Sequence, residues 1–82
     1  MTYPRTQTGV RIETSLLKTL KGLAEYLDMS LGDLIEGIVL HAFEGKPPPF
    51  SAQTRAAIDQ LKQVYGCSLT AADAHTHPEE TR

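Results

Sequence analysis

The side chains with the clearest chemical use lie near the amino terminus, where polar and apolar residues alternate. The polar side of this alternation comprises Gln7, Gly9 and Arg11, and the apolar side comprises Thr8, Val10 and Ile12. A period of two predicts a β-strand over residues 7–12. Because the apolar face should cover the helices that follow, we expect the polar face to point outward, where arginine and glutamine can hydrogen-bond a ligand.

This predicted strand has no partner strand elsewhere in its own chain. A lone strand leaves a row of backbone donors and acceptors unpaired, and an isolated strand is marginal in water. The sequence therefore predicts a homodimer in which two copies pair as an antiparallel ribbon, an element that fits the DNA major groove. The chain has 82 residues, and the segment with the clearest polar and apolar pattern is 7–45. Domains of about this size usually need a metal, disulfides or oligomerisation to be stable.

Positive charge is concentrated on the same segment, although the formal net charge is -2. Residues 1–12 contain Arg5 and Arg11 and no acid, whereas residues 13–45 contain two lysines and six acids. The negative total argues against a protein whose whole surface binds nucleic acid. Pairing two strands would nevertheless bring four arginines together and attract phosphate locally.

Two amphipathic helices are expected after the strand. The first is capped by Thr14 or Ser15 and ends at Asp28-Met29. The second begins at a capping box formed by Ser30 with the acid three residues on. Its apolar stripe comprises Leu31, Leu34, Ile35, Ile38, Val39, Ala42 and Phe43. The stripe is wider than one neighbouring helix covers, so we expect part of it to be buried against a second subunit.

The remaining segments flank this unit. Residues 1–6 are expected to form a flexible arm, and Gly45 to end the second helix. Residues 46–50 contain three consecutive prolines and predict a stiff connector. Residues 51–74 are expected to form a carboxy-terminal extension, with a third helix that Ser51 caps, that runs to about Tyr65 and that Gly66 ends. Residues 75–82 predict a disordered tail.

From residue 7 to residue 43 the pattern resembles the ribbon-helix-helix family, to which the Arc and methionine repressors and many antitoxins belong. The matching pieces, in order, are Arg11-Ile12, Leu20-Lys21-Gly22-Leu23-Ala24, Ser30 and Leu34-Ile35. The resemblance implies a mostly α fold in which one amino-terminal strand pairs antiparallel with that of the dimer mate and two core helices follow. Here an additional carboxy-terminal helix extends that fold.

The resemblance also implies a set of DNA-contacting residues. The outward strand residues would enter the major groove, where arginine and glutamine pair with guanine and adenine edges. The start of the second helix would offer backbone amides to a phosphate. The expected nucleic-acid-binding residues are Arg5 on the arm, Gln7, Gly9 and Arg11 on the strand, and Ser30, Leu31 and Gly32 at the helix start.

The sequence thus favours a dimeric regulator of transcription, repressor-like or antitoxin-like, that binds double-stranded DNA. The sequence departs from the family pattern at several positions. Glu13 stands where a proline is common, and Leu31, Gly32 and Glu36 stand where basic or hydroxyl residues are common. Asp33 lies beside the expected phosphate site, where a carboxylate competes with the anion for the same amides. The acidic second helix and Leu31-Gly32 motivate an alternative, in which the same dimer is a protein-interaction module that has lost DNA binding and uses residues 51–65 as its binding surface.

Other chemistries have little support in the sequence. It contains no glycine-rich phosphate loop and no nucleophile with a positioned base, so neither an enzyme nor a cofactor is expected. His41, His75 and His77 lack the spacing of a metal site. A lone Cys67, with no signal-like amino terminus and no apolar run of membrane-spanning length, favours a cytoplasmic protein without membrane contact.

Overall fold

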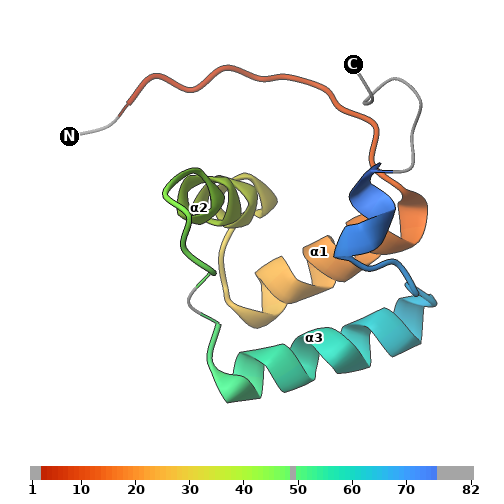
Figure 1. Ribbon diagram of the computed structural model, residues 1–82. Coiled ribbons are helices and arrows are strands. Elements are labelled where there is room, and N and C mark those ends of the chain that lie inside the picture. The colour runs from red at the N-terminus through yellow and green to blue at the C-terminus, as the bar shows by residue number, and fades with distance from the viewer. Residues whose placement is uncertain (1–2, 49, 76–82) are drawn as a thin grey trace.

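The computed structural model describes residues 3–48 and 50–75, which form three α-helices and a short 3₁₀ helix (Figure 1). The elements are α1 (Thr14–Tyr26), α2 (Leu31–Phe43), α3 (Ala52–Tyr65) and η1 (Ala71–His75). The described residues contain no strand, and the fold is mostly α-helical, as expected. The positions of all three long helices agree with the sequence analysis.

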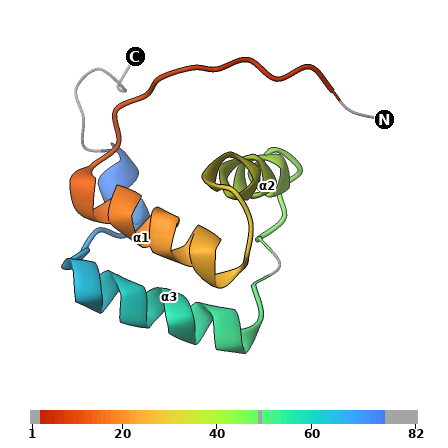
Figure 2. The same cartoon turned by 180° about the vertical axis from the view of Figure 1, so that it is seen from behind.

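Helix α1 lies in the middle of the molecule. Helix α3 runs antiparallel along one side of it, and α2 crosses on the other side (Figures 1 and 2). The contact of α1 with α3 is far more extensive than its contact with α2. Residues 3–13 run as an extended chain on the side of α1 away from α3 (Figure 1).

The core is small and sits where the three helices meet. Its buried apolar centre consists of Leu23 and Ala24 from α1 and Leu34 from α2. Around it pack Leu20, Leu27, Ile38, Phe50, Ile58 and Leu61, all partly buried. Leu34 is only 4% exposed, so this residue anchors α2 to α1.

The amino-terminal cap of α1 differs from the prediction. Glu13, rather than Thr14 or Ser15, is the cap: its Oε1 accepts hydrogen bonds from the Leu16 amide at 2.8 Å and from the Ser15 hydroxyl at 2.7 Å. The prediction was wrong because a glutamate side chain can fold back to the first turn, where its charge suits the positive end of the helix dipole.

The other helix boundaries follow the predicted signals. Ser30 and Ser51 each accept a hydrogen bond from the backbone amide three residues ahead, at 3.1 Å. Gly66 ends α3 with φ at +67°, and Gly45, just past the end of α2, has φ at +72°. The break after α1 falls at Asp28, whose φ of +58° is a left-handed conformation that aspartate tolerates.

The segments around α3 lie partly outside the described residues. The predicted connector 46–50 includes Pro49, which is not described, so its stiffness stays a prediction. His75 is the last residue of η1, whereas the sequence analysis assigned it to the tail. The rest of that tail, 76–82, including His77, lies outside the described residues. None of the helices within 3–48 and 50–75 has the length and apolarity needed to cross a membrane.

Candidate nucleic-acid interface

The predicted strand is extended and exposed in the single chain. Gln7, Gly9 and Arg11 all face solvent, as expected of its polar side. Among the described residues, the backbone groups of residues 7–12 form no backbone-backbone hydrogen bond. The segment therefore carries free donors and acceptors along its length, and the strand and its pairing stay predictions, since the ladder partner would be another chain.

The apolar side of this segment is not covered by its own helices. Val10 is 73% exposed and Thr8 is also exposed, while Ile12, next to α1, is half-buried. The expectation that this face lies on the helices was wrong for the single chain, because the segment passes beside them rather than against them (Figure 1).

One half of the apolar stripe on α2 is only partly covered, since Ile35 is half-buried and Val39, Ala42 and Phe43 are exposed. Leu34 and Ile38 turn toward the core, but the neighbouring face carries Ile35, Val39, Ala42 and Phe43, and Phe43 is 81% exposed. A contiguous apolar face on the surface of a small domain is typical of a contact site. We call Ile35, Val39, Ala42 and Phe43 the open face of α2.

Arg5 is held by α2, a contact that the sequence analysis missed. Its Nη2 lies 2.9 Å from Oδ1 of Asp33 and 3.0 Å from Oε1 of Glu36. All three side chains are more than half exposed. The only signal in the sequence was the opposite charge, because the partners lie 28 and 31 positions apart and no local pattern links them.

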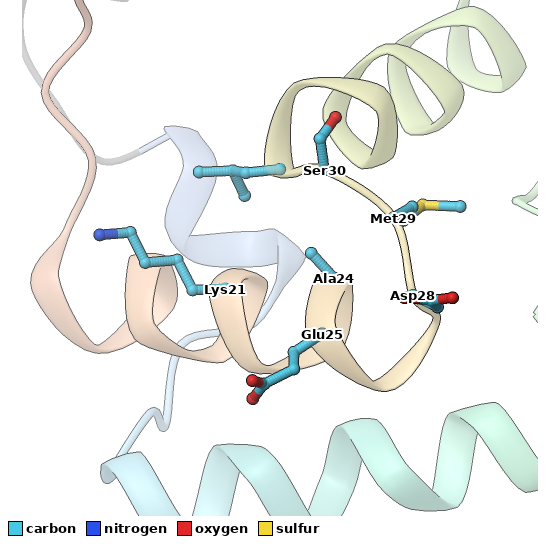
Figure 3. A pocket seen from close by; sticks show the side chains of 7 residues that line it. Lys21, Ala24, Glu25, Asp28, Met29 and Ser30 are labelled. Atoms are coloured by element: carbon cyan, nitrogen blue, oxygen red, sulfur yellow. The ribbon is translucent and has the colours of Figure 1, made fainter.

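The start of α2 is open to solvent. Ser30 and Gly32 are exposed and Leu31 is half-buried, and a Cβ added to Gly32 would meet no atom within 4 Å. A shallow hollow beside this helix start is bordered by Lys21, which was not among the expected contacts (Figure 3). Figure 3 shows Lys21 leaving α1 on the side opposite α3, while Glu25 turns toward α3.

The structure places the candidate residues in two groups. Arg5 lies against α2 through its ion pairs, whereas Arg11 lies at the other end of the extended segment, next to the start of α1 and η1 (Figure 1). Arg11 borders a groove that is also lined by Lys62 and Asp73. Within one chain, therefore, the two arginines do not form a single basic patch.

Glu13 sets the charge at the junction between the extended segment and α1. Hydrogen bonds from the Ser15 hydroxyl and the Leu16 amide lower the pKa of this carboxyl below its ordinary value. Glu13 is therefore negative two residues after Arg11, and its charge is directed at the helix end.

Among the residues that the structure describes, no group of three or more histidine, cysteine, aspartate or glutamate side chains could hold a metal ion. His41 uses Nδ1 in a 2.7 Å hydrogen bond with the carbonyl oxygen of Gly37. Comparisons with protein-family models, with curated proteins and with solved structures found no match to this chain.

Proposed function

We propose that this protein is a homodimeric DNA-binding protein of the ribbon-helix-helix kind, a regulator of transcription that inserts its paired 7–12 segments into the major groove. The observation that carries the proposal is an extended segment with free backbone groups beside a helix whose apolar face is uncovered. Both features are unfavourable in an isolated chain, and a second copy would relieve both at once.

A two-fold symmetric dimer is the simplest way to satisfy these surfaces. In such a dimer each extended segment supplies the hydrogen-bonding partner of the other, and the open face of α2 meets its own copy. Val10 and Phe43, which are mostly exposed in the single chain, would become buried. The wide apolar stripe of α2 supports this arrangement, since α1 covers only its Leu34 side.

The polar side of the paired segments suits DNA. Gln7 and Arg11 are exposed and alternate along an extended backbone, the spacing at which a ribbon in the major groove presents its side chains. Arginine and glutamine are the residues that pair bidentately with guanine and adenine edges. Gly9 between them allows the ribbon to approach the bases closely.

The start of α2 supplies a second contact in this proposal. The backbone amides of Leu31 and Gly32, in the first turn of the helix, can hydrogen-bond a phosphate, and Lys21 on α1 adds a positive charge at the border of the same hollow. Asp33 lies beside these amides, where a carboxylate repels a phosphate, but it forms an ion pair with Arg5. As long as this ion pair is formed, the acid opposes phosphate binding less than its position in the sequence suggests.

The alternative function, a protein-interaction module that uses residues 51–65, has less support. Ile58 and Leu61 on the apolar side of α3 pack on the core formed with α1. Val64 is the large apolar side chain of α3 that stays mostly exposed. Because the apolar side of α3 packs mainly on α1 of the same chain, little of that side remains exposed for a partner protein.

Duplex binding at low salt tests the proposal. We expect Arg11→Ala to weaken binding of a random-sequence duplex and to reduce the slope of log affinity against log salt by about two per dimer, if both arginines contact phosphate. Arg55→Ala is the matched control, because Arg55 is exposed on α3, away from the extended segment. Failure of the folded wild-type protein to bind duplex at about 50 mM salt would refute the proposed function.

A further inference from the structure

We propose that the carboxylates of Asp33 and Glu36 compete with DNA phosphates for Arg5 and so weaken non-specific DNA binding. We call Arg5, Asp33 and Glu36 the Arg5 latch. The competition with DNA rests on the proposed function, whereas the latch itself rests on the two ion pairs of the free chain.

The latch connects the amino-terminal arm to the helices. A single guanidinium nitrogen, Nη2 of Arg5, lies 2.9 Å from one carboxylate and 3.0 Å from the other. Among the described residues, these contacts are the only side-chain hydrogen bonds or ion pairs made by the segment 3–10. These two ion pairs are therefore the side-chain polar contacts that join the described part of the arm to α2.

The spacing of the two acids explains why they share one arginine. Asp33 and Glu36 are three residues apart on α2, so their side chains lie on the same face of the helix. Glu36 also lies three residues before Val39 and seven before Phe43, so the latch borders the open face of α2.

A phosphate is a direct competitor for this arginine. Guanidinium groups bind carboxylate and phosphate oxygens with the same hydrogen-bonding geometry. The latch is exposed, and ion pairs in contact with water are weak and screened by salt, so exchange is easy. The arm is thus held reversibly, and Arg5 can exchange its two carboxylate partners for a DNA phosphate.

Release of Arg5 has a second consequence. The latch carries one positive and two negative charges, and transfer of Arg5 to a phosphate leaves both carboxylates uncompensated beside the DNA. Base contacts at a specific site can offset this repulsion, but a random sequence provides none. The latch should therefore reduce non-specific binding more than specific binding.

The first test removes both acids without changing their shape. In the full-length Asp33→Asn/Glu36→Gln variant, we expect affinity for a random-sequence duplex at about 50 mM salt to rise about 3- to 10-fold. The salt slope should steepen by up to about two per dimer, because each freed Arg5 can neutralise one phosphate. The matched control is Glu25→Gln/Asp59→Asn, which removes the same charge from exposed positions on α1 and α3.

The second test needs no DNA. Trypsin cleaves after arginine, so release of Arg5 should speed cleavage of the Arg5-Thr6 bond at least twofold in the double variant, at low salt. Cleavage at Arg11-Ile12 in the same sample provides an internal control, because Arg11 lies at the other end of the segment. Equal cleavage at Arg5 in wild type and variant would show that the latch does not form and would overturn the proposal.

The two tests separate failure of the latch from failure of the proposed function. Duplex binding by the wild type with no gain over the control double variant overturns the latch as a competitor and leaves the proposed function intact. Absence of duplex binding in every variant overturns both the competition and the proposed function. Faster cleavage at Arg5 together with the affinity gain supports the proposal.

Discussion

The two sides of α1 are covered very differently. On one side α3 packs along the helix, while on the other side α2 makes a less extensive contact with α1. Yet α2 is the more apolar of the two partner helices. A single chain therefore leaves part of its most apolar helix exposed, and this is the pattern expected where a second chain completes the core.

On the side of α1 that packs against α3, a single glycine permits a close approach of the two helices. Gly22 on α1 faces α3, and a Cβ at this position would lie 2.9 Å from Cδ2 of Leu61 and 3.4 Å from Cε2 of Tyr65. Glycine weakens the interior of a helix, so its presence here is explained by the close approach of α3. No comparable contact exists at Gly37 on α2, where an added Cβ would meet no atom within 4 Å.

Charged substitutions in the open face of α2 should have the strongest effect, because they should disrupt the proposed dimer. Val39→Asp/Phe43→Asp should weaken dimerisation by about 100-fold or more, because two unpaired charges would enter an apolar interface. Sedimentation equilibrium measures the change, and circular dichroism should show that helices remain, since Phe43 is exposed in the single chain.

The matched control for this variant adds the same charges to exposed positions of α3. Gln53→Asp/Gln60→Asp should leave the dimer constant unchanged. A wild-type protein that sediments as a monomer at all concentrations would show that the open face of α2 is not a self-association surface.

A glycine-to-alanine substitution should affect stability differently on the side of α1 that α3 covers and on α2, and this effect should be of intermediate size. Gly37→Ala should stabilise the protein by about 1 kcal/mol through helix propensity alone. Gly22→Ala should give a free energy of unfolding about 1–3 kcal/mol lower than Gly37→Ala, because Leu61 must move to accommodate the methyl group. Urea unfolding of the two variants measures the difference, and equal stabilities would contradict the tight packing of α3 on α1.

The smallest effect is expected for Glu13, which lies at the junction of the extended segment and α1. Its pKa is lowered in the folded chain, so its charged form stabilises the fold above the unfolded-state pKa, and this contribution is lost as pH falls through the folded-state pKa. We expect Glu13→Gln to be less stable than wild type near neutral pH, with the difference vanishing in acid. Thermal unfolding across this pH range measures it.

A second variant checks the cause of this shift. Ser15→Ala removes the hydroxyl that donates to the Glu13 carboxylate, so the pKa of Glu13 should move back toward its ordinary value. Titration of the Glu13 carboxyl carbon by NMR reports this directly. An unchanged titration in Ser15→Ala would show that the serine hydroxyl does not lower the pKa.

Sequence reasoning succeeded where the structural cause is local. Ser30 and Ser51 cap their helices as predicted, and Gly66 ends α3 in a left-handed conformation, because each signal acts within one turn of helix. It failed at the start of α1, where the rule that short polar side chains cap helices overlooked the reach of Glu13. It also left Lys21 out of the candidate interface, since the sequence places Lys21 on α1 and not beside the start of α2.

The three helices and the excess of apolar surface on α2 follow from the amino-acid sequence alone, because periodicity and caps depend on neighbouring residues. The packing of α3 on α1 and the position of Arg5 beside Asp33 and Glu36 became visible in the folded chain. Both contacts join residues about 30 or more positions apart, and their formation depends on how the helices pack in space, which no local pattern specifies.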